Sequence, residues 1–235
     1  MSKTKQKRKM LQRKKFQKRI SIKKKMGKPT FFSLCRTHNP LGGFANKYNY
    51  KATLYKVLYN NARIMNIRWN ASHITHCSFR DAKCIGVDFC NTNLKNTSFR
   101  GAALKNVMFF NCNLKGTNFK NATFENVIFV STNLNNAKNL VIDNGCSIYT
   151  SYPKVIIPDE FSKKLYDLYN IPQIRKYNVL FVKENKLNSW ILKILIDMFG
   201  ESVYGALIAI QRENRIEDFY TLYSYIKHIE RYLQT

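Results

Sequence analysis

Basic side chains are the residues of this chain whose type and spacing point most directly to chemistry, because clustered lysines and arginines bind phosphate groups. Residues 1–30 hold fourteen basic and no acidic side chains. Only scattered apolar residues interrupt the run, so we expect an arm that is disordered in isolation. A plain solubilising leader is the alternative. The arm residues that we expect to bind nucleic acid are Lys7, Arg8, Lys9, Arg13, Lys14, Lys15, Lys23, Lys24 and Lys25.

The positive charge continues beyond the arm and then fades. Residues 31–150 carry fourteen basic against four acidic side chains, whereas the remainder carries twelve against ten, within a net charge of +26. This distribution favours a polyanionic partner for the arm and for the segment that follows it. An anionic membrane would attract the same arm, so a peripheral membrane scaffold is an alternative.

Histidines and cysteines do not form a recognisable metal or catalytic set. The tightest group is His73, His76 and Cys77, and its spacing matches no established zinc site. The chain contains no GxGxxG, GxxxxGK[ST], GxSxG or HExxH motif. We therefore predict a protein that is not an enzyme, with no metal, no cofactor and no small-molecule substrate. The six cysteines without a CxxC pair favour a reducing, cytoplasmic location.

The basic residues of 31–150 lie mainly in a segment whose sequence repeats with a period of five. From Ala52 to Ala137 every fifth residue is small, and the residue two places later is large and apolar. This period fits neither an α-helix nor a β-strand, so it indicates a repeat architecture. Asn, Asp and Gly dominate the second place after each large residue, and these types tolerate a positive φ. Each unit is thus predicted to hold two inward residues and a corner, a pattern that offers no enclosed pocket of its own.

The repeats resemble the pentapeptide-repeat family, whose loose motif is small, Asn/Asp, Leu/Phe, polar, Gly/Asn. Good matches are Thr-Asn-Leu-Lys-Asn from Thr92 to Asn96 and Thr-Asn-Phe-Lys-Asn from Thr117 to Asn121. The resemblance implies a mainly β fold, a right-handed quadrilateral β-helix with four units, or 20 residues, per coil. We expect this pentapeptide-repeat solenoid over 52–140, with a little over four coils and an N-terminal cap segment at 31–51.

The 20-residue coil that the resemblance implies aligns five basic residues on the outside. One face would carry Arg80, Arg100 and Lys120, and the adjacent face Lys95 and Lys115. Neighbouring rungs would lie about 4.8 Å apart, so the side chains would repel one another unless a polyanion lies along them. We expect these residues to bind nucleic acid, with a merely solvated face as the alternative.

The same coil brings apolar side chains to the outside of another face. Cys90, Phe110 and Val130 would form one column, and Met108 and Ile128 the next. Such a patch needs a cover. The candidates are the C-terminal helices of this chain, a second copy or a partner protein, and we favour the first.

Residues 153–235 are predicted to form a small α-helical region. The candidate helices span 159–169, 188–199, 202–212 and 215–233, and the second and fourth have apolar residues at helical spacing. Such stripes are typical of a core, so we expect a helical cap docked on the repeats. The same helices offer a face for a homodimer.

The charges and the repeats together predict a non-catalytic adaptor. Its partner would be nucleic acid or a nucleoprotein complex, such as a topoisomerase on DNA or the ribosome. The resemblance supplies an alternative, a gyrase-interacting protein of antibiotic resistance that resembles DNA in shape and charge. That mimicry requires an acidic rod, whereas these repeats are basic; contact with gyrase through the arm or the helices is left open.

Overall fold

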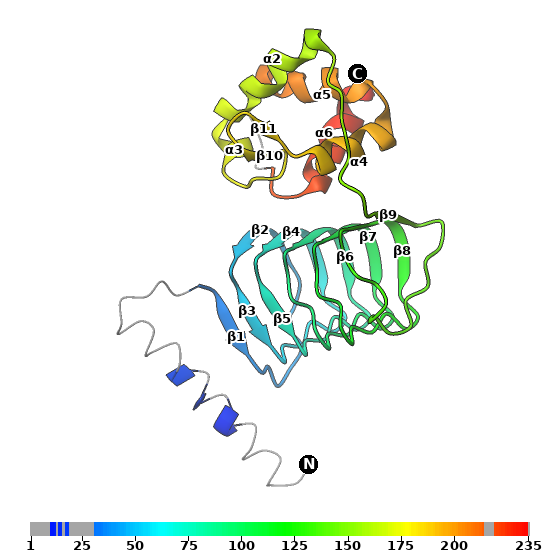
Figure 1. Cartoon of the computed structure of the whole chain (residues 1–235). Helices are drawn as coiled ribbons and strands as arrows, with labels where there is room; N and C mark the ends of the chain where they lie inside the picture. Colours follow the sequence, from blue (N-terminus) through cyan, green and yellow to red (C-terminus); the bar gives the residue numbers. More distant parts are fainter. Residues whose placement is uncertain (1–9, 13, 16, 19–30, 214–218, 235) are drawn as a thin grey trace.

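The computed structural model describes residues 10–12, 14, 15, 17, 18, 31–213 and 219–234. A β-solenoid of about six turns spans residues 33–149, and a helical region follows it (Figure 1). The predicted fold class, a four-sided β-helix with a C-terminal helical region, is confirmed.

Parallel strands stack along the solenoid with a 20-residue repeat. Ile64 pairs with Cys84, Cys84 with Leu104 and Leu104 with Phe124. The larger sheet has the order β2 (Phe44–Tyr50), β4 (Arg63–Asn70), β6 (Lys83–Cys90), β7 (Ala103–Phe110), β8 (Thr123–Val130), β9 (Cys146–Tyr149). The smaller sheet has the order β1 (Ser33–Cys35), β3 (Thr53–Tyr55), β5 (His73–Thr75).

Each coil turns at the corner residues that the sequence predicts. In one coil, Lys56, Asn61, Asn66 and Ala71 all have a positive φ, between 50° and 59°. We name the four faces by the positions of this coil: face 1 (52–55), face 2 (57–60), face 3 (62–65) and face 4 (67–70). The large sheet bends around the corner between faces 3 and 4.

The inward positions form a continuous apolar core. From Ala52 to Phe119 every residue of the small and large series is buried. The ring of Phe99 is stacked between those of Phe79 and Phe119, with centroids 5.0 and 5.4 Å apart. Buried hydroxyls are satisfied by the neighbouring coil, since Thr97 donates to the carbonyl of Ile74 at 2.6 Å.

The solenoid is longer at both ends than the predicted range of 52–140. Residues 31–51, for which we predicted a cap, supply β1 and β2 and thus form a first coil. Gly43 permits this, because a Cβ there would lie 1.8 Å from the carbonyl oxygen of Arg63. At the other end Val127 pairs with Cys146, so the last coil is one residue short and breaks the repeat of five.

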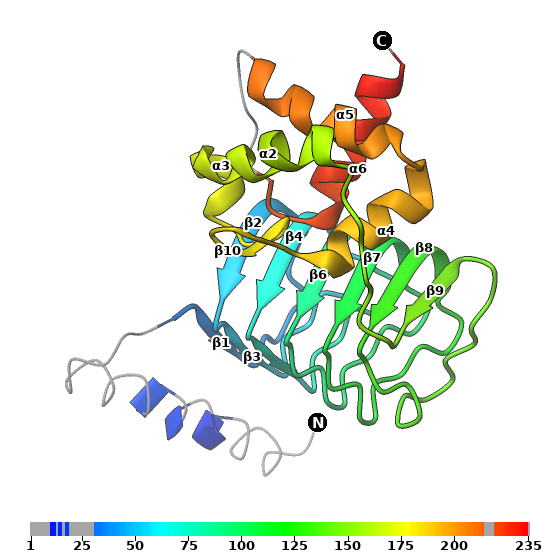
Figure 2. The same ribbon diagram turned by 45° about the horizontal axis from the view of Figure 1, so that its top comes forward.

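The helical region agrees with the predicted helices to within a few residues where it is described. The last helix begins at Leu222, and residues 215–218 of its predicted range lie outside the described part. The helices of this region are α2 (Asp159–Asp167), α3 (Pro172–Arg175), α4 (Ser189–Phe199), α5 (Ser202–Ala209) and α6 (Leu222–Leu233), with 3-10 turns η1 (Leu168–Asn170) and η2 (Ile210–Arg212). A hairpin of β10 (Phe181–Lys183) and β11 (Lys186–Leu187) precedes α4. The region lies over the large sheet, on the side that carries face 4 (Figure 2).

Candidate nucleic-acid interface

Face 2 carries the first basic column. Arg80, Arg100 and Lys120 are exposed and follow one another at the 20-residue repeat. The backbone beside them is stacked, because the amide of Asp81 donates to the carbonyl of Arg100, and that of Gly101 to Lys120, both at 2.9 Å. The three side chains therefore lie on successive coils, with rungs about 4.8 Å apart.

Face 1 carries the second basic column. Lys95 and Lys115 are exposed on adjacent coils, whose backbones pair at Asn93 and Asn113. Asn93 accepts a hydrogen bond from the amide of Lys95 at 3.1 Å, and Asn113 from that of Lys115 at 3.0 Å. These local Asx turns fix the backbone at the lysines.

The corner between faces 1 and 2 joins the two columns. Lys56 and His76 occupy successive corner positions, and the amide of His76 donates to the carbonyl of Lys95 at 3.0 Å. Burial lowers the pKa of His76, and the charges of Lys56 and Lys95 lower it further. Part of the lowered pKa of His76 therefore comes from the positive charges of this edge.

Few acidic groups neutralise this edge among the described residues. Asp81 lies 3.4 Å from Arg80, Glu125 pairs with Lys105 on face 3, and Asp88 is buried on face 4. We call this set of residues the basic band. It consists of Lys56, which is half-buried, and of the exposed residues His76, Arg80, Lys95, Arg100, Lys115 and Lys120. It lies on faces 1 and 2, whereas the helical region covers face 4.

Lys56 and Lys138 lie in this region but are absent from the predicted set. Lys56 sits at a corner, and Lys138 pairs with Asn118 and extends face 2 by one coil. Counting by 20 residues from position 118 would have placed Lys138 correctly. Lys56 departs from the Asn, Asp or Gly that the pattern predicts at corners, so the pattern assigns it no role.

The arm falls mostly outside the described residues. Of the predicted arm cations, Lys14 and Lys15 are described, and both are helical and exposed. The same stretch contains Gln12, which accepts a hydrogen bond from Arg36 at the start of the solenoid. The predictions for the remaining arm residues, Lys7, Arg8, Lys9, Arg13, Lys23, Lys24 and Lys25, lie outside the described part.

The apolar columns of face 4 lie beneath the helical region. Cys90, Met108, Ile128 and Val130 are buried in one cluster with residues of α4, α5 and α6, and Phe110 packs against that cluster. The ring of Phe110 meets that of Trp190 edge-on at 6.5 Å. The cover in this structure is thus the chain's own helices, the candidate that we favoured.

A buried polar latch, which the sequence did not reveal, holds the start of α6 against face 4. Asp88 accepts hydrogen bonds from Arg68 at 3.0 Å and from the amide of Leu222 at 2.9 Å. Asn66 accepts from the hydroxyls of Thr221 at 2.7 Å and Ser224 at 2.9 Å. Burial raises the pKa of Asp88 to about 6, against the opposing effect of Arg68. These contacts fix the orientation of the helical region.

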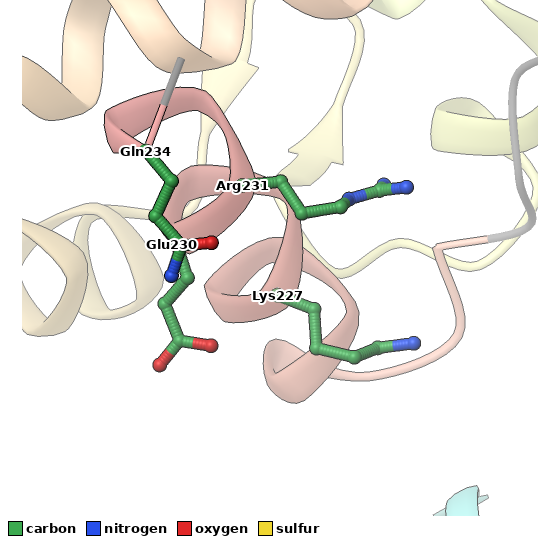
Figure 3. A pocket seen from close by; sticks show the side chains of 4 residues that line it. All are labelled: Lys227, Glu230, Arg231 and Gln234. Atoms are coloured by element: carbon green, nitrogen blue, oxygen red, sulfur yellow. The ribbon is translucent and has the colours of Figure 1, made fainter.

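Two of the cavities are lined by residues of the solenoid. A cavity of about 380 Å³ lies between face 4 and the helical region, and one of about 340 Å³ opens at the first coil. A third pocket, of about 250 Å³, lies on α6 and is lined by polar side chains, with Lys227 and Arg231 on the opposite side from Glu230 (Figure 3). The repeat pattern predicted no enclosed pocket. The largest of these cavities could not be predicted from it, because the docked helical region forms one of its walls.

Neither a metal site nor a membrane span is found in the described part of the chain. No three His, Cys, Asp or Glu side chains gather closely enough there to hold a metal ion. His76 is exposed whereas Cys77 is buried, so the tightest sequence group does not converge. Among the described helices, none has the length and apolar character needed to cross a membrane.

Comparison with known protein families identifies the repeats. The family described as "Pentapeptide repeats" matches residues 72–109 and 108–138, with eight copies. No curated protein sequence matches the chain.

Solved structures with the same repeats match at low identity. A pentapeptide repeat protein from the Arabidopsis thaliana thylakoid lumen is 17% identical, with 46% of this chain and 70% of that one covered and a TM-score of 0.29. The protein Rfr23 from the cyanobacterium Cyanothece 51142 is 20% identical, with 41% and 64% covered and a TM-score of 0.28. QnrB1, a plasmid-mediated fluoroquinolone resistance protein, is 10% identical, with 50% and 90% covered and a TM-score of 0.23.

Proposed function

We propose that this chain, whose residues 72–138 match the pentapeptide-repeat family, is a non-catalytic adaptor that binds nucleic acid, free or in a nucleoprotein complex, through the basic band and the arm. The observation that carries this proposal is the alignment of exposed cations on faces 1 and 2. Arg100, Lys115 and Lys120 have no ion pair with another described residue. A polyanion along the band would relieve their mutual repulsion.

Backbone phosphates are the groups that such a band would contact. The cations repeat at the coil spacing, and the neighbouring side chains are mainly Ser, Thr and Asn, which donate to phosphate oxygens. No element of the described solenoid projects far enough to enter a groove of the duplex as a recognition helix does. We therefore propose binding that depends little on base sequence and steeply on salt.

Charge reversal with a matched control tests the proposal. Arg100→Glu combined with Lys120→Glu removes two rungs of the band. Lys163→Glu combined with Lys164→Glu makes the same charge change on exposed positions of α2. Fluorescence anisotropy with a short labelled duplex, measured over a salt series, is expected to give a slope lower by about 2 for the first variant only. Equal losses in both variants would mean that net charge alone attracts the duplex.

The two alternative functions predict different assay results. A gyrase-interacting resistance protein would protect gyrase supercoiling from a quinolone without needing affinity for DNA. A peripheral membrane scaffold would sediment with anionic vesicles but not with neutral ones, and the effect would depend on the arm. A cytoplasmic nucleic-acid adaptor is expected to do neither.

A further inference from the structure

The cavity between face 4 and the helical region is distinct from the basic band. It measures about 380 Å³, within the usual range of small-molecule sites. Its walls come from the solenoid between Arg68 and Phe110 and from the helical region between Tyr152 and Ile191. A ligand there would contact both parts of the molecule.

One wall of the cavity is aromatic and apolar. Trp190 meets Tyr152 edge-on at 5.6 Å and Phe110 edge-on at 6.5 Å. Met108 and Ile191, both buried, complete this wall. Such a surface accepts a flat apolar group.

The polar lining includes two cations and no acidic residue. Arg68 and Lys186 line the cavity together with four asparagines, Asn70, Asn91, Asn178 and Asn188, whose side-chain amides can donate or accept hydrogen bonds. Arg68 is only 5% exposed, and although Asp88 and the carbonyl of Asn178 occupy its two terminal nitrogens, its Nε has no hydrogen-bond partner among the described residues.

The first turn of α4 adds a second source of positive potential. Trp190 and Ile191, in this turn, line the cavity. Asn188 precedes the helix but does not cap it, because its side-chain amide donates to the carbonyl of Val179 at 3.1 Å. An 11-residue helix with no side-chain cap presents free N–H groups and the positive end of its dipole.

We propose that this cavity binds a small organic anion with a flat apolar body, its acidic group facing Arg68, Lys186 and the start of α4 and its body against Trp190 and Phe110. Bound in this position, the ligand joins face 4 to the helical region and stabilises their docking by mass action. The site is independent of the basic band, which lies on faces 1 and 2.

Titration with 8-anilinonaphthalene-1-sulfonate, an aromatic sulfonate with a flat naphthalene ring, tests the proposal on the full chain. Binding is followed by fluorescence and by calorimetry, and a single saturable site is expected. Lys186→Glu reverses the charge of the exposed lysine that lines the cavity. Val182 also lines the cavity and is exposed, so Val182→Trp is designed to fill part of the cavity with a larger side chain. Lys183→Glu is the control, because it makes the same charge change on the same hairpin outside the lining.

We expect Kd to rise about ten-fold or more in Lys186→Glu and in Val182→Trp, a change of about 1.4 kcal/mol, and to be nearly unchanged in Lys183→Glu. N-phenyl-1-naphthylamine, which lacks the sulfonate, is expected to bind more weakly. Absence of binding, equal affinity in all four proteins, or equal affinity for the uncharged compound would overturn the proposal. Circular dichroism of each variant shows that it is folded.

Discussion

Gly86 lies directly beneath Tyr223 of α6. Its φ is +65°, and a Cβ at this position would lie 2.1 Å from Cδ1 of the tyrosine ring. Only glycine therefore allows α6 to approach face 4 so closely.

Gly86→Ala is expected to destabilise the protein by about 1–3 kcal/mol, because the new methyl group forces α6 away and strains the corner. Urea unfolding measures the change. Gly42→Ala is the control, since a Cβ there would meet nothing within 4 Å. An unchanged midpoint for Gly86→Ala would show that α6 does not pack on this corner.

Asp88 gives the latch a pH dependence. Burial raises its pKa from 3.8 to about 6 in the folded protein. Between these two values the folded protein holds a proton that the unfolded chain lacks, so this group makes the free energy of unfolding rise as pH falls from 6 towards 4. The contribution is at most about 1.4 kcal/mol per pH unit.

The comparison of wild type with Asp88→Asn isolates this effect from the other titrating groups. We expect the stability of wild type relative to the variant to increase as pH falls through 6, measured by urea unfolding at several pH values. The opposite trend would show that Arg68 dominates and holds the pKa of Asp88 below its ordinary value.

The stability of the solenoid depends on the stacked aromatic side chains of its core. Phe99 is fully buried and stacked on both sides by Phe79 and Phe119. Phe99→Ala opens a cavity that the rigid coils cannot fill, so we expect a loss of about 3–5 kcal/mol. Phe32→Ala, at a ring that is 56% exposed, is expected to change stability by less than about 1 kcal/mol. Similar losses in thermal or urea unfolding would contradict the continuous core.

The repeat of five made the middle of this fold predictable from sequence, because each residue type at an inward or corner position has a direct steric reason. The ends were missed where the pattern breaks. Pro40 and Gly42 interrupt it in the first coil, and the last coil has one residue fewer, between Val127 and Cys146. Strand pairing survives in both places because the backbone, not the side-chain pattern, makes the hydrogen bonds.

The candidate site was predictable in part for the same reason. Arg80, Arg100 and Lys120 could be aligned by counting, since their positions repeat every 20 residues. The latch could not, because Asn66 and Thr221 are 155 residues apart and no period relates them. The hairpin before α4, and with it the cavity wall, is likewise too short to leave a sequence pattern.

Most cysteine side chains are buried in the folded protein. Cys35, Cys77, Cys84, Cys90 and Cys112 are buried, and Cys146 is half-buried. Burial raises the pKa of Cys77, Cys84 and Cys90 to about 12, which leaves almost no reactive thiolate.

A thiol-reactive dye should therefore label Cys146 in the native protein and all six cysteines in denaturant. Cys146→Ser is the control that removes native labelling. Rapid labelling of Cys90 would contradict the docking of the helical region on face 4.

A homodimer through the C-terminal helices stays a prediction, which sedimentation of the same samples would test.

The proposed function depends on binding at the basic band. The pKa of His76, which lies in this band, is a direct probe of that binding. The pKa of this histidine is lowered by burial and by Lys56 and Lys95. Phosphates along the band would offset those charges, so NMR titration of the imidazole is expected to give a higher pKa with a bound nucleic-acid duplex than without it. His76→Gln assigns the signal among the four histidines. Binding of the duplex with no change in this pKa would contradict an interface on faces 1 and 2.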